Sequence, residues 1–298
     1  MLVRHRLPIV RLVCHGLLLL TLLADVAAGA TAATTRFTEK DPQGGVANVL
    51  KRIGWKLPSD ATERDYDLSQ ESFVLRVPES VGERKPGVLA FISPGNSGDI
   101  PEPFEPLLDK HHLIWVAANK VSNKRPLWSR IALTLDGIHN VRSRYEIDED
   151  RVYVAGVSGG GRTASFMGVC FADLIDGGLY IIGTDFYRIM PATNDPGKYW
   201  PKAYDMPPVK ILSLAKKRSR HVMLNGDSDI NRFQSQAIVK QMKREHFEHV
   251  DYLEAPGVGH RLPGTEWVEK ALEKLDEPVA DARQTKPTTR EAPKPRLK

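Results

Sequence analysis

Short apolar runs recur along the chain, and longer segments with helical spacing lie between them. Residues 88–92, 113–117 and 152–155 are continuous apolar runs of strand length, which predicts strands that are covered on both faces. Residues 73–77 alternate apolar and polar side chains, as a half-buried strand does. Three more strands are expected at residues 179–182, 221–224 and 250–253.

Helical segments fill the intervals between these expected strands. Residues 128–145 carry four aliphatic side chains at helical spacing, and a glycine-rich start leads into a helix that ends near Cys170. Two more helices are expected at residues 233–247 and 264–276. Short buried strands that alternate with helices predict an α/β fold with a doubly wound, mostly parallel sheet. We expect a single domain over residues 63–276.

Residues 1–62 are predicted to lie outside this domain. Residues 1–30 hold three arginines, then an apolar run at 17–23, then small residues up to Ala30. This is the order of an export signal with its cleavage site, which predicts a periplasmic or secreted protein. The apolar run is well short of the ~20 residues that a membrane-spanning helix needs, so no stable membrane insertion is expected. Residues 31–62 are predicted to be an irregular lead-in.

The charge of the protein is concentrated at its two ends. The 298 residues carry a formal net charge of +5, of which residues 1–30 hold +2 and residues 277–298 hold +3. The latter segment is rich in Pro, Thr, Lys and Arg, which predicts a disordered tail. Residues 31–276 are therefore neutral overall. Binding to nucleic acid needs an excess of cations on one face, so no nucleic-acid partner is expected.

One pentapeptide carries candidate chemistry. Gly156-Val157-Ser158-Gly159-Gly160 has the form G-x-S-x-G and lies directly after an expected strand and directly before an expected helix. In that position the pattern predicts a nucleophile elbow, a sharp turn that exposes the serine hydroxyl above the sheet. A simple glycine-rich turn between strand and helix is the other interpretation of the five residues alone.

An acid and a histidine follow the serine in the order that such a nucleophile requires. Asp227 and Asp229 come just after the expected strand at 221–224, and His260 comes after the strand at 250–253. Open α/β sheets place their functional sites at the carboxyl ends of strands. A serine is a weak nucleophile without a neighbouring base. The three segments together therefore predict a Ser-His-Asp triad.

On these residues the chain resembles the serine esterases of the α/β-hydrolase superfamily, in the secreted branches with lipases, feruloyl esterases and polyhydroxyalkanoate depolymerases. The resemblance covers about residues 70–275. It implies that the acid closes a G-x-x-D turn, which favours Asp229 and leaves Asp227 as the second candidate. It also implies that the histidine follows a glycine, as in Gly259-His260. The implied enzyme cleaves a small or polymeric ester through an acyl-enzyme intermediate and needs no cofactor or metal.

The resemblance also implies an oxyanion hole with two backbone donors. One is the N–H of Gly159, the residue after the nucleophile. The other comes from the loop after the strand at 88–92, where this chain has Ser93-Pro94-Gly95-Asn96-Ser97-Gly98 in place of the family's usual His-Gly. Pro94 has no N–H. Gly95, Asn96 and Ser97 therefore remain candidates, and Asn96 is preferred.

The segment 184–208 separates two expected strands and is rich in proline and aromatic residues. As a cap it would use Tyr187, Trp200 and Tyr204 to wall a substrate pocket, because aromatic side chains combine apolar contact with a polar tip. As a rigid surface loop it would only pack on the domain. The sequence leaves both interpretations open.

The sequence also allows three other functional interpretations. Residues 156–163 are one substitution away from a phosphate-binding P-loop, but Arg162 stands where that motif needs lysine. His246 and His249 have metal-ligand spacing on a helix, without a third ligand in a matching context, so no metal site is expected. A non-catalytic binding or surface domain on the same scaffold is the main alternative to the esterase.

Overall fold

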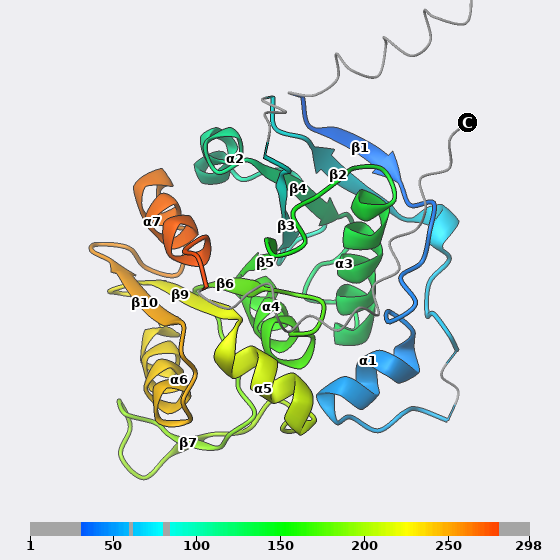
Figure 1. Cartoon of the computed structure of the whole chain (residues 1–298). Helices are drawn as coiled ribbons and strands as arrows, with labels where there is room; N and C mark the ends of the chain where they lie inside the picture. Colours follow the sequence, from blue (N-terminus) through cyan, green and yellow to red (C-terminus); the bar gives the residue numbers. More distant parts are fainter. Residues whose placement is uncertain (1–30, 60–61, 80–83, 280–298) are drawn as a thin grey trace, which may run out of the picture.

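The computed structural model describes residues 31–59, 62–79 and 84–279. The predicted export signal and residues 280–298 of the predicted tail lie outside them. An eight-stranded sheet runs through the molecule in the order β1-β2-β4-β3-β5-β6-β9-β10 (Figure 1). Its strands are β1 Ala33–Arg36, β2 Ser72–Arg76, β3 Gly87–Ile92, β4 Leu113–Ala118, β5 Val152–Val157, β6 Gly177–Ile181, β9 Arg220–Gly226 and β10 Val250–Ala255.

The sheet is mostly parallel, as the sequence predicts. Strands β4, β3, β5, β6, β9 and β10 pair in parallel with their neighbours. Only β2 pairs antiparallel with β4, and β1 antiparallel with β2. The parallel strands place all their carboxyl ends at one edge of the sheet. Ser158, Asp229 and His260 each follow one of these ends.

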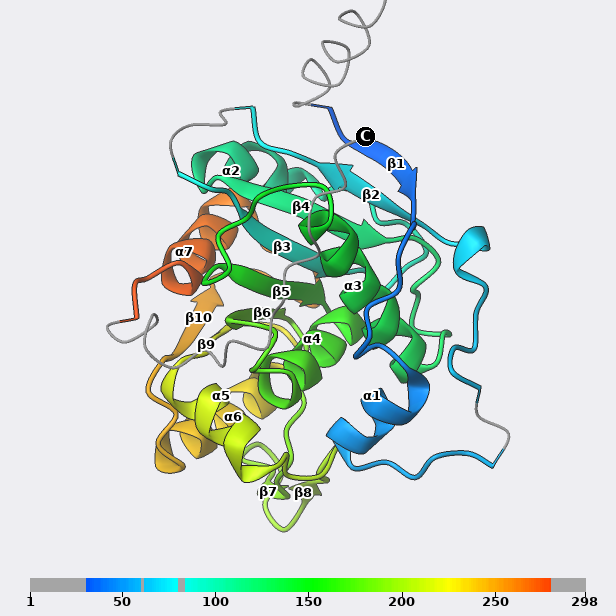
Figure 2. The ribbon, with the colours of Figure 1, turned by 45° about the vertical axis from the view of Figure 1, so that its right-hand side comes forward.

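Helices cover both faces of the sheet (Figures 1 and 2). They are α1 Val46–Ile53, α2 Glu105–Lys110, α3 Leu127–Arg142, α4 Gly159–Cys170, α5 Val209–Lys217, α6 Arg232–Arg244 and α7 Thr265–Leu275, with short 3₁₀ helices at Leu68–Gln70 and Glu102–Phe104. Buried side chains of α1, α3, α4, α5 and α6 belong to one core cluster, and those of α2 and α7 belong to another.

Strand β3 shows how the continuous apolar runs serve these two cores. Val88, Ala90 and Ile92 point into the first cluster, whereas Leu89 and Phe91 point into the second. Successive side chains of a strand point to opposite faces, so a strand covered on both faces needs apolar residues at every position. The sequence therefore predicts a doubly wound sheet, and the structure confirms it.

The lead-in at residues 31–62 has more structure than its sequence pattern predicts. It contains strand β1, which extends the sheet, and helix α1, which packs on α3 and α4. Val46, Val49, Leu50 and Ile53 form the buried face of α1 at helical spacing. The helix ends at Gly54, whose φ of 71° is the left-handed conformation that stops a helix. The sequence pattern did not predict this short helix because the helical spacing of its apolar residues extends over only about two turns.

A buried carboxylate fastens the lead-in to the domain. Asp136 of α3 is fully buried and accepts hydrogen bonds from the backbone N–H of Asp41 at 2.7 Å and from the Tyr66 hydroxyl at 2.7 Å. Arg64 donates to the same carboxylate at 3.1 Å. Burial nonetheless raises the pKa of Asp136. None of the described helices is both long enough and apolar enough to cross a bilayer.

Candidate active site

Ser158 occupies the turn between β5, in the middle of the sheet, and α4. Its φ of 54° and ψ of −118° lie outside the conformations that L-residues ordinarily adopt. Such strain persists only where the surrounding structure imposes it, and it is common at functional sites. The predicted elbow is thus present in the backbone. Its serine is half-buried, at the amino end of a helix.

Two glycines allow the chain to pass through this turn. A Cβ atom on Gly160 would lie 1.9 Å from the carbonyl oxygen of Ile92, at the end of β3. A Cβ atom on Gly156 would lie 2.3 Å from the carbonyl carbon of Gly160. Both contacts are with backbone, which cannot move aside as a flexible side chain can. The glycines of G-x-S-x-G are therefore required here for close approach rather than for positive φ.

The three predicted side chains lie together as a hydrogen-bonded chain. The Oγ atom of Ser158 is 3.0 Å from Nε2 of His260, and Nδ1 of His260 is 2.7 Å from Oδ1 of Asp229. The Asp229 side chain is completely buried, whereas that of His260 is 35% exposed. The serine can therefore lose a proton to a ring whose far nitrogen is held by a buried carboxylate.

The loop after β9 assigns different positions to the two candidate acids. Asp229 faces His260, and its carboxylate also accepts hydrogen bonds from Nδ2 of Asn225 and from the backbone N–H of Asn231. Asp227 instead accepts from the backbone N–H of Gly257 at 3.0 Å. That hydrogen bond, with a second from the Ser228 hydroxyl, lowers the pKa of Asp227. Asp227 thus connects the loop after β9 (the acid loop, residues 227–231) to the loop after β10, which carries His260.

A polar network that the sequence did not predict includes Asn231, whose backbone N–H donates to Asp229. Arg162 of α4 forms an ion pair with Asp185 and donates to Oδ1 of Asn231 at 3.0 Å. The side chain of Asn231 in turn donates to the carbonyl of Ile182 at 2.8 Å. Ile182 has a φ of 48°, unusual for a β-branched residue. No motif marks these residues, because they come from three separate segments.

Two carbonyls of the loop after β3 accept hydrogen bonds from the segment that follows β4. The carbonyl oxygen of Pro94 accepts a hydrogen bond from the N–H of Asn123, and that of Asn96 accepts from the N–H of Lys120. The N–H of Gly95 donates to the Ser93 hydroxyl, which removes it from the candidate oxyanion donors. Within the described residues, no acceptor binds the N–H groups of Asn96 and Ser97.

Asn123, which the sequence did not single out, lies beside Gly159. The carboxamide of Asn123 is packed on Gly159, such that a Cβ atom added there would lie 2.1 Å from Oδ1 of Asn123. Asn123 is exposed, and its backbone N–H donates to the carbonyl of Pro94 in the loop after β3. Gly159, whose N–H is the first expected donor, therefore needs to be glycine to leave room for this side chain.

Comparison with known proteins places this arrangement within a known fold. No protein-family model and no curated protein sequence matches the chain. Among solved structures it is similar to the S-formylglutathione hydrolase FrmB of Staphylococcus aureus, with 13% identity and a TM-score of 0.52 over 82% of this chain and 97% of that one. The chain has the α/β-hydrolase fold.

Two further structures show the same fold. The fluorophosphonate-binding serine hydrolase FphF of S. aureus is 13% identical, with a TM-score of 0.50 over 83% of this chain and 96% of that one. A protein described as FAE is 14% identical, with a TM-score of 0.51 over 83% of this chain and 87% of that one. At such low identity the likeness concerns the α/β-hydrolase fold alone.

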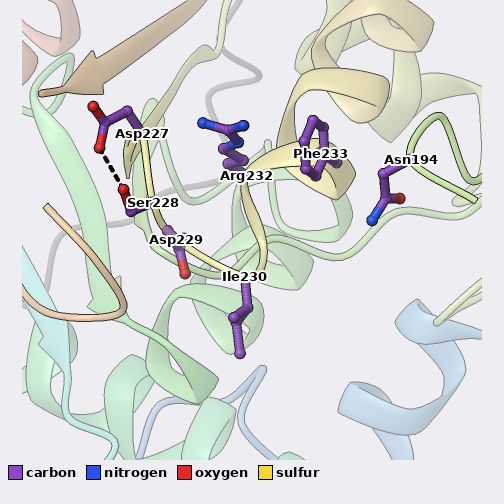
Figure 3. Close-up of a pocket in the computed structure, with 7 residues that line it drawn as sticks. All are labelled: Asn194, Asp227, Ser228, Asp229, Ile230, Arg232 and Phe233. Atoms are coloured by element: carbon purple, nitrogen blue, oxygen red, sulfur yellow. Dashed lines mark hydrogen bonds between the residues drawn. The ribbon is translucent and has the colours of Figure 1, made fainter. Parts of the chain in front are cut away.

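A cavity of about 640 Å³ opens beside the acid loop of this α/β-hydrolase fold (Figure 3). Residues of the acid loop and of the start of α6 line most of it. Asn194 lines it from the turn between two short strands, β7 Met190–Pro191 and β8 Tyr199–Trp200. Ile230, next to Asp229, is 78% exposed in it. The hairpin of the segment 184–208 thus contributes Asn194 to a cavity that Asp229 also lines.

The aromatic residues predicted to wall a pocket lie elsewhere. Tyr204 is buried, and its ring packs on Phe166 with centroids 4.5 Å apart. Tyr187 is buried too, and its hydroxyl donates to Glu245. Trp200 is half-buried against the same core cluster. Tyr187 and Tyr204 therefore offer no surface to a substrate in this structure. They anchor the segment while Asn194 reaches the cavity.

No group of three or more His, Cys, Asp and Glu side chains within the described ranges could hold a metal ion. His246 and His249 both lie in the turn between α6 and β10, and His246 has a φ of 62°. Cys170 is fully buried, and burial raises the pKa of its thiol. A thiol of raised pKa in an apolar environment is unsuited to act as a nucleophile.

Proposed function

We propose that the protein is a serine hydrolase that cleaves a carboxylic ester through an acyl-enzyme intermediate. The observation that carries this proposal is the chain of hydrogen bonds from Ser158 through His260 to the buried Asp229. It lies at the carboxyl edge of the sheet, with the serine on a strained turn at a helix amino end. The α/β-hydrolase fold of the chain is consistent with this chemistry.

In the first half of the reaction, Ser158 is acylated. Its Oγ atom attacks the ester carbonyl carbon while Nε2 of His260 takes the hydroxyl proton. Asp229 fixes the ring so that Nδ1 keeps its proton and stabilises the imidazolium that forms. The carbonyl oxygen becomes an oxyanion. The tetrahedral intermediate then expels the alcohol, which receives its proton from His260, and leaves the acyl group on Ser158.

In the second half, water releases the acid. His260 accepts a proton from the water as its oxygen attacks the acyl carbon, and the proton then returns to Oγ of Ser158. We assign the oxyanion donors to the N–H groups of Gly159 and Asn96. The N–H groups of Asn96 and Ser97 bind no acceptor in the described part of the chain, whereas that of Gly95 is already used. Of these two, Asn96 is the donor preferred from the sequence.

We further propose that the mature enzyme is exported, with cleavage after Ala30. The support is the order of arginines, apolar run and small residues in the first thirty positions. Expression of the full-length chain with its natural start, followed by amino-terminal sequencing of the product, tests this. A mature chain that starts at Thr31 is expected, and an intact amino terminus on the exported product would contradict it.

Hydrolysis of p-nitrophenyl esters of graded acyl length tests the proposed reaction. The wild type should release p-nitrophenol, and Ser158→Ala should lower kcat by at least about 10³-fold. Ser165→Ala is a matched control on the same helix, where the hydroxyl donates to the carbonyl of Arg162 rather than to His260. Equal rates for wild type and Ser158→Ala, or no hydrolysis by either at any acyl length, would contradict the esterase and favour a binding domain.

A further inference from the structure

Arg130, in the first turn of α3, lies behind the backbone that is proposed to bind the oxyanion. Only 5% of the residue is exposed. One terminal nitrogen, Nη1, donates to the carbonyl of Gly159 at 3.2 Å, and the other, Nη2, donates to the carbonyl of Ser93 at 3.2 Å. Gly159 follows the nucleophile, and Ser93 begins the oxyanion loop. The guanidinium thus joins the two segments that are expected to supply the donors.

These two segments are already in close backbone contact. Gly160 approaches the carbonyl of Ile92 so closely that a Cβ atom would lie 1.9 Å from it. Ser93 follows Ile92, and Gly159 precedes Gly160. Arg130 therefore binds the residues next to the two that make this contact. A change in the position of either segment would lengthen one of its two hydrogen bonds. The arginine therefore fixes the distance between the oxyanion loop and the elbow.

The charge of Arg130 has no carboxylate partner in the described structure. Three other buried arginines do have one: Arg64 pairs with Asp136, Arg76 with Asp109, and Arg151 with Asp276. Arg220, also buried, instead donates to the Tyr153 hydroxyl at 3.5 Å. Arg130 binds only carbonyl oxygens, and its Nε atom is buried without an acceptor. Burial lowers its pKa to about 10, which still leaves it protonated at neutral pH.

This arrangement is unfavourable for stability but suited to an anionic intermediate. A buried charge without a counter-ion carries a desolvation cost that an apolar residue of similar volume would avoid. The negative charge that appears during ester cleavage forms on the other side of the same backbone segments. A fixed positive charge in a site of low dielectric stabilises that negative charge more than it would in water.

We propose that Arg130 is a positioning residue for the oxyanion hole: it clamps the loop 93–98 to the first residue of α4 and supplies an unpaired positive charge behind them. This inference rests on the proposed ester hydrolysis. It predicts a loss of transition-state stabilisation, not of ground-state binding, when the guanidinium is removed. It also predicts that the loss of activity is separate from any loss of folding stability.

Arg130→Met and Arg130→Lys test the proposal, with Arg76→Met as the control. Methionine keeps an unbranched stem without the charge, and lysine keeps the charge without the two-pronged geometry. Arg76 is buried and is the last residue of β2, where it pairs with Trp115 near the amino end of β4. It therefore lies at the opposite edge of the sheet from Ser158, Asp229 and His260. For each variant, kcat and KM with p-nitrophenyl acetate and the midpoint of thermal unfolding are measured.

Arg130→Met should lower kcat by about ten- to a hundredfold with KM changed by less than about twofold. Arg130→Lys should recover part of that loss. The thermal midpoint of Arg130→Met should fall by no more than about 4 °C. Arg76→Met, which leaves Asp109 without its partner, should lower the midpoint and leave kcat unchanged. Wild-type kcat in Arg130→Met, or a kcat loss matched by a fall in the folded fraction, would overturn the proposal.

A reversible inhibitor provides a second measurement that does not depend on turnover. Oγ of Ser158 adds to the carbonyl carbon of a trifluoromethyl ketone, its proton passes to His260, and the ketone oxygen becomes an oxyanion. Arg130→Met should weaken binding of this ketone by the factor by which kcat/KM falls. Unchanged ketone affinity would overturn the role of Arg130. A wild type that neither hydrolyses esters nor binds the ketone would overturn the proposed function itself, and the inference with it.

Discussion

Asn225 donates a hydrogen bond from Nδ2 to Oδ2 of Asp229 at 2.5 Å, while Oδ1 of the same carboxylate lies 2.7 Å from Nδ1 of His260. Each oxygen of the buried acid thus has its own partner, and the carboxylate plane is fixed relative to the imidazole. Both side chains lie in the core at the end of β9, where water cannot replace a lost hydrogen bond. Asn225 therefore helps to orient the carboxylate that contacts His260, together with the N–H of Asn231.

Asn225→Ala should lower kcat roughly tenfold, because the loss of a hydrogen bond to a buried charged group costs on the order of 1–3 kcal/mol. KM should change little, because Asn225 contacts the acid rather than the substrate. Steady-state kinetics with a p-nitrophenyl ester measure both. A variant with unchanged kcat would show that the other contacts of Asp229 hold it in place without Asn225.

The two carboxylates of the acid loop should differ sharply in their effect on catalysis. Asp229→Asn should lower kcat on the order of 10⁴-fold, because an amide cannot hold the same imidazole tautomer or stabilise the imidazolium. Asp227→Asn should change kcat by less than about threefold, because the amide oxygen can still accept from the N–H of Gly257. Comparable losses in the two variants would contradict the assignment of Asp229 as the triad acid.

Glycine at position 160 should be essential for folding. Gly160→Ala should reduce the free energy of unfolding by about 3 kcal/mol or more, because its Cβ atom would meet the carbonyl of Ile92. Gly264→Ala is the matched control, because nothing lies within 4 Å of a Cβ atom there, and it should cost less than about 1 kcal/mol. Urea denaturation measures both. Equal stabilities would show that the contact between β3 and α4 relaxes without cost.

His221 should make the fold sensitive to acid. The ring is fully buried, with Nε2 donating to the carbonyl of Ala215 and Nδ1 accepting from the Tyr180 hydroxyl. Burial lowers its pKa to about 4, below the 6.5 of an exposed histidine. Between pH 4 and pH 6.5 the unfolded chain binds a proton at His221 more readily than the folded chain does. The contribution of His221 to the free energy of unfolding is therefore fully present above pH 6.5 and is lost as the pH falls toward 4.

A comparison with His221→Gln isolates this contribution. From pH 7 to pH 4 the wild type should lose on the order of 3 kcal/mol more unfolding free energy than the variant. Urea titrations at several pH values supply the two curves. Parallel curves would mean that His221 is protonated with equal ease in the folded and unfolded chains.

The sheet and the convergence of Ser158, Asp229 and His260 were predictable from sequence because both depend on where the strands end. Strand β3 is apolar at every position, and the carboxyl end of each parallel strand is fixed by topology. The contrast between Asp227 and Asp229 followed from the resemblance to serine esterases, and the hydrogen bonds of Asp229 agree with it. In such cases the chemistry follows directly from where a strand ends.

The features that the sequence did not reveal depend on contacts between distant segments. Whether Tyr204 faces a pocket or the core is decided by Phe166, 38 positions earlier, and nothing near Tyr204 indicates it. In the sequence Arg130 is an ordinary polar position on a helix. Only the structure shows its partners, the carbonyls of Ser93 and Gly159. Helix α5 was missed because only two of its nine residues are buried.

Labelling with a fluorophosphonate probe tests the central claim most directly, because it needs no knowledge of the natural substrate. Oγ of Ser158 would form a bond to phosphorus, fluoride would leave, and the hydroxyl proton would pass to His260. The wild type should gain one label per chain, mapped to Ser158 by peptide mass spectrometry, and His260→Ala should be labelled at least about a hundredfold more slowly. No label on the wild type, a label on another residue, or an equal rate in His260→Ala would contradict the account.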